Sequence, residues 1–172
     1  MQALLGLIEA QLAFETPSIG GKDSMSGTFN QLHVPPTLIT FAVTTAKSDQ
    51  IISPEFKKAG NYIYVIAHHP HADHTPDYDE LKQNFDKVRE LIRKGTIVSA
   101  ATVKFGGMAE AICKMSFGNH IGAACRSELS FYDLMPGSIV VEASESILDG
   151  SFTLLGITTE EKDIVLNEEK VS

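Results

Sequence analysis

Apolar positions recur at helical spacing over the first residues of the chain. They lie on one side of a 3.6-residue repeat, which predicts a helix over residues 2–14. These positions are Leu4, Leu5, Ile8, Leu12 and Ala13. Thr16-Pro17 ends the helix, because proline disfavours helical backbone in the residue before it. A glycine-rich polar segment then predicts a loop over residues 20–27, and an apolar run predicts a strand over residues 37–45.

The second part of the chain gives a clearer pattern. Residues 78–94 combine one apolar face with acidic residues at the start and basic residues at the end, which suits the helix dipole, and Gly95 fits the stop. A second helix is predicted over residues 107–117, ending at Gly118. Short apolar runs predict strands over residues 62–67, 97–103, 121–125, 138–143, 152–157 and 164–166. Helices and strands alternate only in part, so we expect an α/β or α+β fold with a mixed sheet and flanking helices.

A polar stretch over residues 46–60, with Pro54 and Gly60, predicts a domain boundary near residue 50. We therefore expect one part over residues 1–50 and a second over residues 51–172. There is no internal repeat and no low-complexity tract.

Composition narrows the class of protein. Of the 172 residues, 43% are hydrophobic and 21% are charged, as is typical of a globular domain. The net charge of −8 disfavours binding to a nucleic-acid backbone. No apolar run is long enough to span a bilayer, and the start carries Glu9 without a basic leader, unlike a signal peptide. Cys113 and Cys125 are isolated thiols in apolar segments, so we expect them to be buried and inert, in a protein of the reducing cytoplasm.

The segment Gly20-Gly21-Lys22-Asp23-Ser24 carries candidate binding chemistry. Paired glycines let a backbone approach a ligand closely, and exposed amides can then hold an anion. Lys22 adds a positive charge, Ser24 a hydroxyl, and Asp23 a carboxylate that could ligate a cation such as Mg²⁺. A capped surface turn would explain the same residues without a ligand. No catalytic residue is assigned, because no nucleophile or paired-carboxylate arrangement can be recognised.

Four histidines fall within seven residues: His68, His69, His71 and His74. Asp73 and Asp77 lie nearby, and imidazole with carboxylate is a good set of zinc ligands. The spacing matches no zinc motif, however, and no cysteine is close. We expect a polar loop, with adventitious zinc or nickel binding as the alternative.

Two longer motifs resemble a known enzyme family. One runs from Thr16 through the glycine-lysine-aspartate-serine-methionine-serine residues to Gly27, followed by Pro35-Pro36 and an apolar strand. The other is Phe105-Gly106-Gly107-Met108 with the helix that follows. Together they resemble the second synthetase half of phosphoribosylformylglycinamidine synthase (formylglycinamide ribonucleotide amidotransferase) of the large single-chain type, in the aminoimidazole ribonucleotide synthetase superfamily.

The resemblance implies an architecture and an activity. Residues 1–50 would be the tail of an amino-terminal-type synthetase domain, and residues 51–172 a carboxy-terminal-type domain. The family is an ATP- and Mg²⁺-dependent ligase that converts formylglycinamide ribonucleotide and glutamine to the amidine in purine biosynthesis. The chain would then be a fragment, inactive alone, whose partners are the first synthetase half and the glutaminase domain. Its truncated first part would expose Leu4, Ile8 and Phe41, so self-association is expected.

The family also implies roles for the candidate residues. In its compact multi-subunit form the matching loop reads glycine-glycine-asparagine-x-serine, where the second glycine touches ATP, the asparagine binds magnesium and the serine meets substrate. By position, Gly21 would approach ATP and Ser24 would contact substrate. Lys22 replaces the asparagine; protonated lysine cannot ligate a metal, so we expect it to contact phosphate and leave Asp23 as the candidate metal ligand.

A second departure lies before the paired glycines. Residues 102–105 supply no carboxylate where many superfamily members carry an acidic run, so Gly106 and Gly107 are expected only to allow close helix packing. Two alternatives stay open. The chain could be a non-catalytic docking module of that enzyme, or another member of the same ATP-binding superfamily, acting on aminoimidazole ribonucleotide precursors, selenide or thiamine phosphate.

Overall fold

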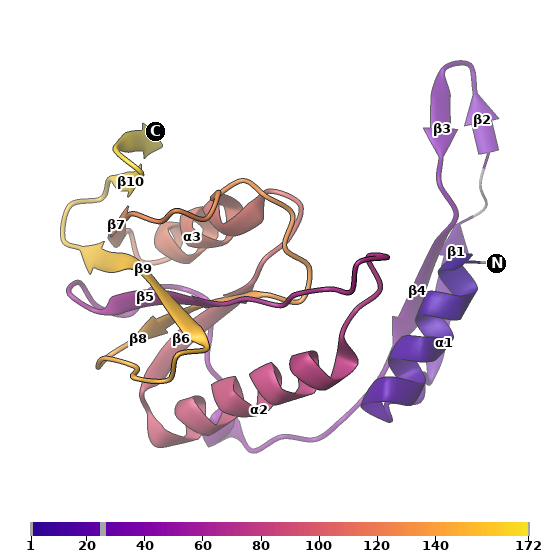
Figure 1. Cartoon of the computed structure of the whole chain (residues 1–172), viewed down its shortest axis with the longest axis horizontal. Coiled ribbons are helices and arrows are strands. Elements are labelled where there is room, and N and C mark those ends of the chain that lie inside the picture. The colour runs from indigo at the N-terminus through magenta and orange to yellow at the C-terminus, as the bar shows by residue number, and fades with distance from the viewer. Residues whose placement is uncertain (1, 25–26, 172) are drawn as a thin grey trace. The chain divides into compact units, whose positions relative to one another are not determined.

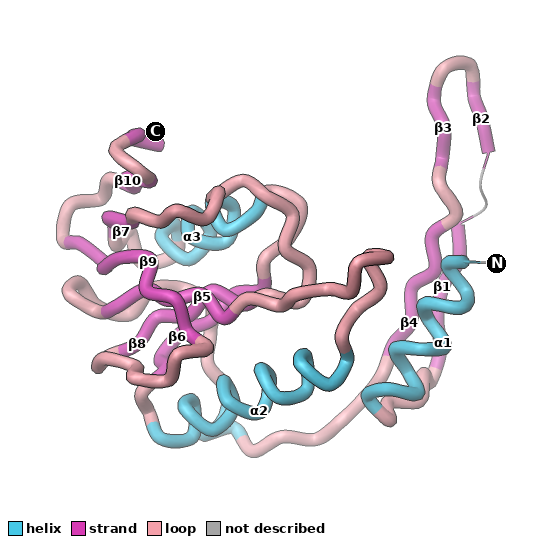
Figure 2. The backbone as a smooth tube through the Cα atoms, viewed as in Figure 1, coloured by secondary structure: helices cyan, strands magenta, loops and turns pink. Residues whose placement is uncertain are grey.

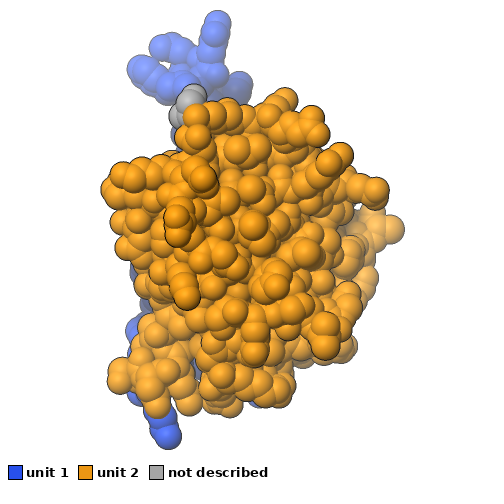
Figure 3. Space-filling view, turned by 90° about the vertical axis from the view of Figure 1, so that its left-hand side faces the viewer, with its two compact units in different colours: residues 1–47 blue, residues 48–172 orange. Residues whose placement is uncertain are grey.

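A computed structural model describes residues 2–24 and 27–171. The chain forms two compact units, residues 1–47 (unit 1) and residues 48–172 (unit 2), shown in different colours in Figure 3. The division falls close to residue 50, where the polar stretch lies. Among the described residues, no helix has both the length and the apolar character needed to cross a membrane.

Unit 1 consists of one helix and two pairs of short strands. Helix α1 (Gln2–Phe14) confirms the predicted helix and lies alongside the antiparallel pair β1 (Gly20–Ser24) and β4 (Thr37–Phe41), as Figure 2 shows. Strands β2 (Gly27–Phe29) and β3 (Leu32–Val34) form a hairpin that the sequence did not predict. None of the described residues of unit 1 is fully buried.

Unit 2 is built on a seven-stranded mixed sheet, ordered β11-β10-β7-β9-β5-β8-β6. The strands are β5 (Tyr62–Ile66), β6 (Ile97–Thr102), β7 (Gly122–Cys125), β8 (Ile139–Ala143), β9 (Phe152–Thr159), β10 (Ile164–Leu166) and β11 (Glu169–Val171). The β7–β10 pair is parallel and the other pairs are antiparallel. A mixed α/β fold was therefore predicted correctly, although β11 was missed.

The two long helices of unit 2 cover opposite faces of this sheet (Figure 1). Helix α3 (Gly107–Phe117) buries Met108, Ile112 and Met115 against one face. Helix α2 (Tyr78–Lys94) packs Val88 against the other, beside Ile97 and Val141. Both helices have the predicted bounds, and a short 3-10 turn (Ser48–Gln50) begins the unit. The core is thus a three-layer arrangement, with apolar side chains alternating between the two sheet faces.

Candidate functional site

The predicted binding segment is a strand and not a loop. Residues Gly20–Ser24 form β1, with Gly20 opposite Phe41 and Ser24 opposite Thr37 on β4. Glycine, aspartate and serine have low strand propensity, which is why the segment was wrongly predicted as a loop; pairing with the apolar β4 overrides that preference. Met25 and Ser26 of the motif, and the side chain of Ser24, lie outside the described part of the structure.

Gly21 is held in close contact with the neighbouring strand. A Cβ added at this position would lie 2.5 Å from the carbonyl oxygen of Ile39, whereas Gly20 has open space around it. The absence of a side chain at Gly21 therefore allows β1 to approach β4 closely. This packing accounts for Gly21 without a ligand, and its predicted contact with ATP stays a prediction.

Lys22 and Asp23 lie on opposite faces of the β1–β4 pair. The hollow between α1 and β4, of about 360 Å³, is lined on the strand side by Leu38, Thr40 and Ala42. Directly opposed residues share a face, and Asp23 is opposite Leu38, so Asp23 lies on the α1 side. Lys22 is opposite Ile39 and lies on the other side. The two side chains are both exposed, and they do not converge on a common point.

The face that carries Lys22 has exposed apolar side chains on β4 beside the polar Thr37. Ile39 is 49% exposed and Phe41 is 53% exposed, and both are opposed to β1 residues on that face. The Lys22 ammonium donates to the carbonyl oxygen of Asp23 at 3.2 Å, an exposed bond that water could replace. An exposed ammonium beside exposed apolar side chains forms a surface that can receive a phosphorylated ligand once other groups cover it.

In unit 2 the histidine segment is organised by hydrogen bonds. His68 is buried, and its Nε2 accepts the backbone N–H of Asp77 at 3.1 Å, so Nδ1 carries the proton and donates to the carbonyl oxygen of Pro136 at 3.0 Å. Both ring nitrogens are therefore used. His69 Nδ1 lies 2.8 Å from Oε1 of Glu80. Within residues 2–24 and 27–171, no group of three or more histidine, cysteine or carboxylate side chains could hold a metal ion.

Asp77 caps α2, and this cap has a pH dependence. Its carboxylate accepts the backbone N–H groups of Glu80 at 3.0 Å and Asp79 at 3.1 Å. The Glu80 N–H bond is the main reason that the pKa of Asp77 lies below its usual value. The stabilisation is then present above the unfolded-state pKa and is lost as the pH falls through the lowered folded-state pKa.

We expect Asp77→Asn to flatten this part of the acid dependence, because asparagine also caps helices but does not titrate. Thermal melting from neutral pH down to below the ordinary aspartate pKa of about 3.9 would measure it. Asp79→Asn is the matched control, since it removes a charge from the same turn and no cap. An Asp77→Asn protein with the wild-type acid slope would contradict the prediction.

The paired glycines before α3 have a structural role. The backbone N–H of Gly106 donates to Oε2 of Glu110 at 2.8 Å, and Lys114 binds the other oxygen of that carboxylate. The Lys114 hydrogen bond is the main cause that holds the pKa of Glu110 below its usual value. The carboxylate of Glu110 therefore already occupies the position near the start of α3 where an anionic ligand could otherwise bind. The expectation that the glycines serve packing agrees with the close approach of Gly107 to residues 131–132, whereas a Cβ at Gly106 would meet only the Glu110 side chain.

The expectation of buried thiols is confirmed for Cys125 and is wrong for Cys113, which is half-buried. Cys125 is buried in the core below α3, and burial raises its pKa to about 12. Cys113 is half-buried, and its pKa is also raised by burial. Thiolate formation is needed for nucleophilic or metal-binding chemistry, so neither cysteine is a candidate for it.

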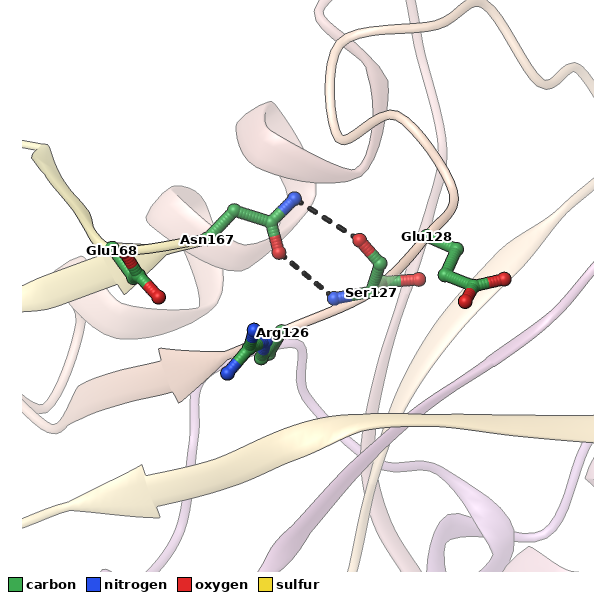
Figure 4. Close-up of a pocket in the computed structure, with 5 residues that line it drawn as sticks. All are labelled: Arg126, Ser127, Glu128, Asn167 and Glu168. Atoms are coloured by element: carbon green, nitrogen blue, oxygen red, sulfur yellow. Dashed lines mark hydrogen bonds between the residues drawn. The ribbon is translucent and has the colours of Figure 1, made fainter.

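A hollow of about 530 Å³ lies where the parallel strands β7 and β10 end. Figure 4 shows its five lining residues: Arg126, Ser127, Glu128, Asn167 and Glu168. The side-chain amide of Asn167 accepts the N–H of Ser127 at 2.9 Å and donates to its carbonyl oxygen at 3.1 Å. No pattern in the sequence predicts this contact, because it joins residues 40 positions apart. Its role is to hold the ends of the two strands together.

Comparison with known proteins finds distant relatives, although no protein-family model matches the chain. The chain is 23% identical over 161 residues to phosphoribosylformylglycinamidine synthase subunit PurL of Lactobacillus delbrueckii subsp. bulgaricus, covering 81% of this chain and 22% of that protein. It is 28% identical over 144 residues to PurL of Sulfurimonas denitrificans, covering 73% and 19%. The chain therefore spans about a fifth of the length of these curated relatives.

Solved structures share the fold. PurLQS from Thermotoga maritima superposes with a TM-score of 0.61 at 12% identity, covering 78% of this chain and 27% of that one. Thermotoga maritima PurL complexed with FGAR has a TM-score of 0.57 at 11% identity, covering 80% and 29%. The chain thus has a distant similarity to PurL over most of its length. The correspondence to the second half of the large single-chain type stays a prediction.

Proposed function

We propose that the chain is part of an ATP-dependent carbon–nitrogen ligase of the phosphoribosylformylglycinamidine synthase type. The whole enzyme would use glutamine as amide donor and convert formylglycinamide ribonucleotide to the amidine in cytoplasmic purine biosynthesis. The observation that carries the proposal is the Gly-Gly-Lys-Asp-Ser strand, exposed over residues 20–23, in a chain with distant similarity to PurL. In this proposal, residues 1–50 belong to an amino-terminal-type domain and residues 51–172 to a carboxy-terminal-type domain of the second synthetase half.

We assign the phosphate contact to Lys22. Its ammonium is exposed and free to reorient, and a charge-assisted bond to a phosphate oxygen is stronger than its present bond to a backbone carbonyl. The ligand is ATP or formylglycinamide ribonucleotide, and both present phosphate. Thermotoga maritima PurL has been solved with each of ATP and FGAR, which supports these two as the ligands to test.

The fit to magnesium is weaker. Mg²⁺ in nucleotide sites is held by one or two carboxylates together with substrate phosphates. Asp23 offers one carboxylate, and it lies on the face opposite Lys22, so both residues could not meet the same phosphate through their side chains. The metal role of Asp23 stays a prediction, and no step of the proposal depends on it.

The isolated chain is expected to be inactive because its site is incomplete. Around Lys22 the described residues offer exposed apolar side chains and no second cation, whereas phosphoryl transfer needs several fixed charges around the phosphate. The remaining first synthetase half and glutaminase domain would supply them. Leu4, Ile8 and Phe41 are exposed, at 47%, 42% and 53%, which is the basis for expecting self-association of unit 1.

Within the enzyme that contains this chain, Lys22→Met should raise the KM for ATP or for formylglycinamide ribonucleotide by roughly tenfold to a hundredfold. The substitution removes the ammonium and keeps the length of the side chain. Steady-state kinetics would measure the change, and Lys47→Met is the control because it alters the other lysine of unit 1. Unchanged constants for Lys22→Met would refute the phosphate role.

A second candidate function is a docking module without catalytic residues. It is favoured by the packing explanation for Gly21 and by the exposed apolar surface of unit 1. Titration of the isolated chain with ATP and Mg²⁺ separates the two. Tight binding would support an autonomous nucleotide site. Absence of binding would leave either a docking module or a site completed by other domains. The kinetics of Lys22→Met in the whole enzyme then distinguish these two.

A further inference from the structure

The two edges of the sheet in unit 2 are built differently. At one edge, β11 has only three residues and carries the charged Lys170, which forms an ion pair with Asp163 at 2.8 Å. Short strands and charged side chains both disfavour the addition of another strand. At the other edge, β6 has six residues and carries neither a charged residue nor a proline. Within the described ranges no strand pairs with the outer side of β6.

Unpaired backbone groups can be assigned along this edge. The N–H of Val103 donates to the carbonyl oxygen of Ser138 at 2.9 Å, directly opposite in the β6–β8 register. Inward and outward groups alternate along an antiparallel strand, so the N–H and C=O groups of Ala101 also point toward β8. Those of Ala100 and Thr102 point away from it, into open space beside the sheet. No backbone partner for either residue is found in the described part of the chain.

A groove runs beside these groups, between β6 and α3, with a volume of about 390 Å³. Its walls are lined by Pro54, Ala100, Ala101, Thr102, Lys104, Glu110, Ala111 and Lys114. The floor is made of small side chains, which leave room for the side chains of an added strand. Lys104 is exposed and forms no ion pair with the described residues, while Lys114 pairs with Glu110. The groove therefore has two ammonium groups for one carboxylate.

We propose that the β6 edge is a docking surface for an extended, acidic segment of a partner polypeptide. The segment adds as a strand beside β6, and its backbone bonds the outward groups of Ala100 and Thr102. Its carboxylates lie toward Lys104, and small or branched side chains cover Ala101. A second copy of this chain is a poorer occupant, because pairing of two β6 edges would bring the ammonium groups of Lys104 and Lys114 of both copies together without an equal number of carboxylates. The inference does not depend on the nucleotide site proposed for unit 1.

The test uses the full chain and two synthetic peptides of opposite charge. The probes are acetyl-Val-Glu-Val-Glu-Val-amide and acetyl-Val-Lys-Val-Lys-Val-amide, followed by two-dimensional ¹H–¹⁵N NMR. The acidic peptide should shift the amide signals of Ala100 and Thr102 more than those of Ser99 and Ala101, whose N–H groups already bond β8. The basic peptide should bind at least about tenfold more weakly, as expected for losing a charged contact.

Two variants separate the backbone and charge contributions. Thr102→Pro removes one outward N–H without disturbing the bonds to β8, as prolines on edge strands do, and should abolish binding, whereas Thr102→Val keeps that N–H and should bind normally. Lys104→Glu should reverse the preference to the basic peptide. The proposal is overturned if neither signal shifts, if both peptides bind equally, or if binding survives Thr102→Pro. It is also overturned if sedimentation shows a dimer whose Ala100 and Thr102 amides are protected without peptide, since the occupant is then a second copy.

Discussion

Glu142→Leu is expected to lower the free energy of unfolding by about 3–5 kcal/mol, since it leaves several donors of a buried hydrogen-bond network without an acceptor. Glu142 lies on β8, and its side chain is fully buried. It accepts the backbone N–H of Lys57 at 2.8 Å, the amide of Asn61 at 2.7 Å and the hydroxyl of Ser99 at 2.7 Å. Leucine fills similar space and accepts none of these bonds.

The donors around Glu142 explain why the loss should be large. All of them are neutral, and the two backbone N–H groups, of Lys57 and Lys58, cannot rotate to find another partner. A buried donor left without an acceptor costs about 1–3 kcal/mol. Stabilities of single domains lie near 5–15 kcal/mol, so the variant would lose a large fraction of its stability. The carboxylate holds the segment before β5 against β8, the strand next to the β6 edge.

Urea unfolding followed by circular dichroism would measure the effect. Glu145→Gln is the matched control, since Glu145 is an exposed carboxylate three residues further along. Among the described residues, it accepts a hydrogen bond only from the Thr96 hydroxyl. We expect that control to change stability by less than about 0.5 kcal/mol. Ser99→Ala should fall between the two, because it removes one donor and leaves the carboxylate bound by the others. A Glu142→Leu protein as stable as the control would contradict this account.

The sequence predicted the elements of unit 2 well because their signals are local. The helix at residues 78–94 has its apolar face, its charges and its terminal glycine within its own length, and the structure confirms both bounds. The strand around Val140 was predicted from its apolar run. The role of Glu142 could not be predicted, because its donors Lys57 and Asn61 lie 85 and 81 residues away.

In unit 1, by contrast, the strand that carries the candidate site could not be predicted from local sequence. Gly20–Ser24 has the composition of a loop, and only its pairing with β4 makes it a strand. That pairing also determines the face of the strand on which each side chain lies. Lys22 and Asp23 are neighbours in the sequence motif, but their side chains lie on opposite faces of the β1–β4 pair. Periodicity cannot reveal this, since a strand's two faces are defined only once its partner and its packing helix are known.

Gly107→Ala is expected to cost roughly 2–4 kcal/mol, from a strained backbone and an overpacked contact together. Gly107 has a φ of +69°, in the left-handed region that favours glycine. A Cβ there would lie 2.4 Å from the carbonyl oxygen of Phe131 and 2.8 Å from the carbonyl carbon of Tyr132. These are backbone atoms, and the Phe131 oxygen is already fixed by the N–H of Ala109 at 2.8 Å.

The neighbouring Gly106 provides the matched comparison. It has an ordinary φ of −85°, and a Cβ there would meet only the side chain of Glu110, at 2.7 Å. The nearest of these atoms is the Cβ of Glu110, which does not move when the side chain rotates, so Gly106→Ala also needs a small shift of the first turn of α3. The hydrogen bond from Gly106 to Glu110, worth about 1 kcal/mol, is weakened as well, but no unfavourable φ is added. Chemical unfolding of both variants should rank Gly107→Ala well below Gly106→Ala. Equal losses of stability would mean that both glycines matter only for the geometry of the first turn of α3. The predicted order would mean that glycine is needed at position 107 because of its contact with Phe131 and Tyr132.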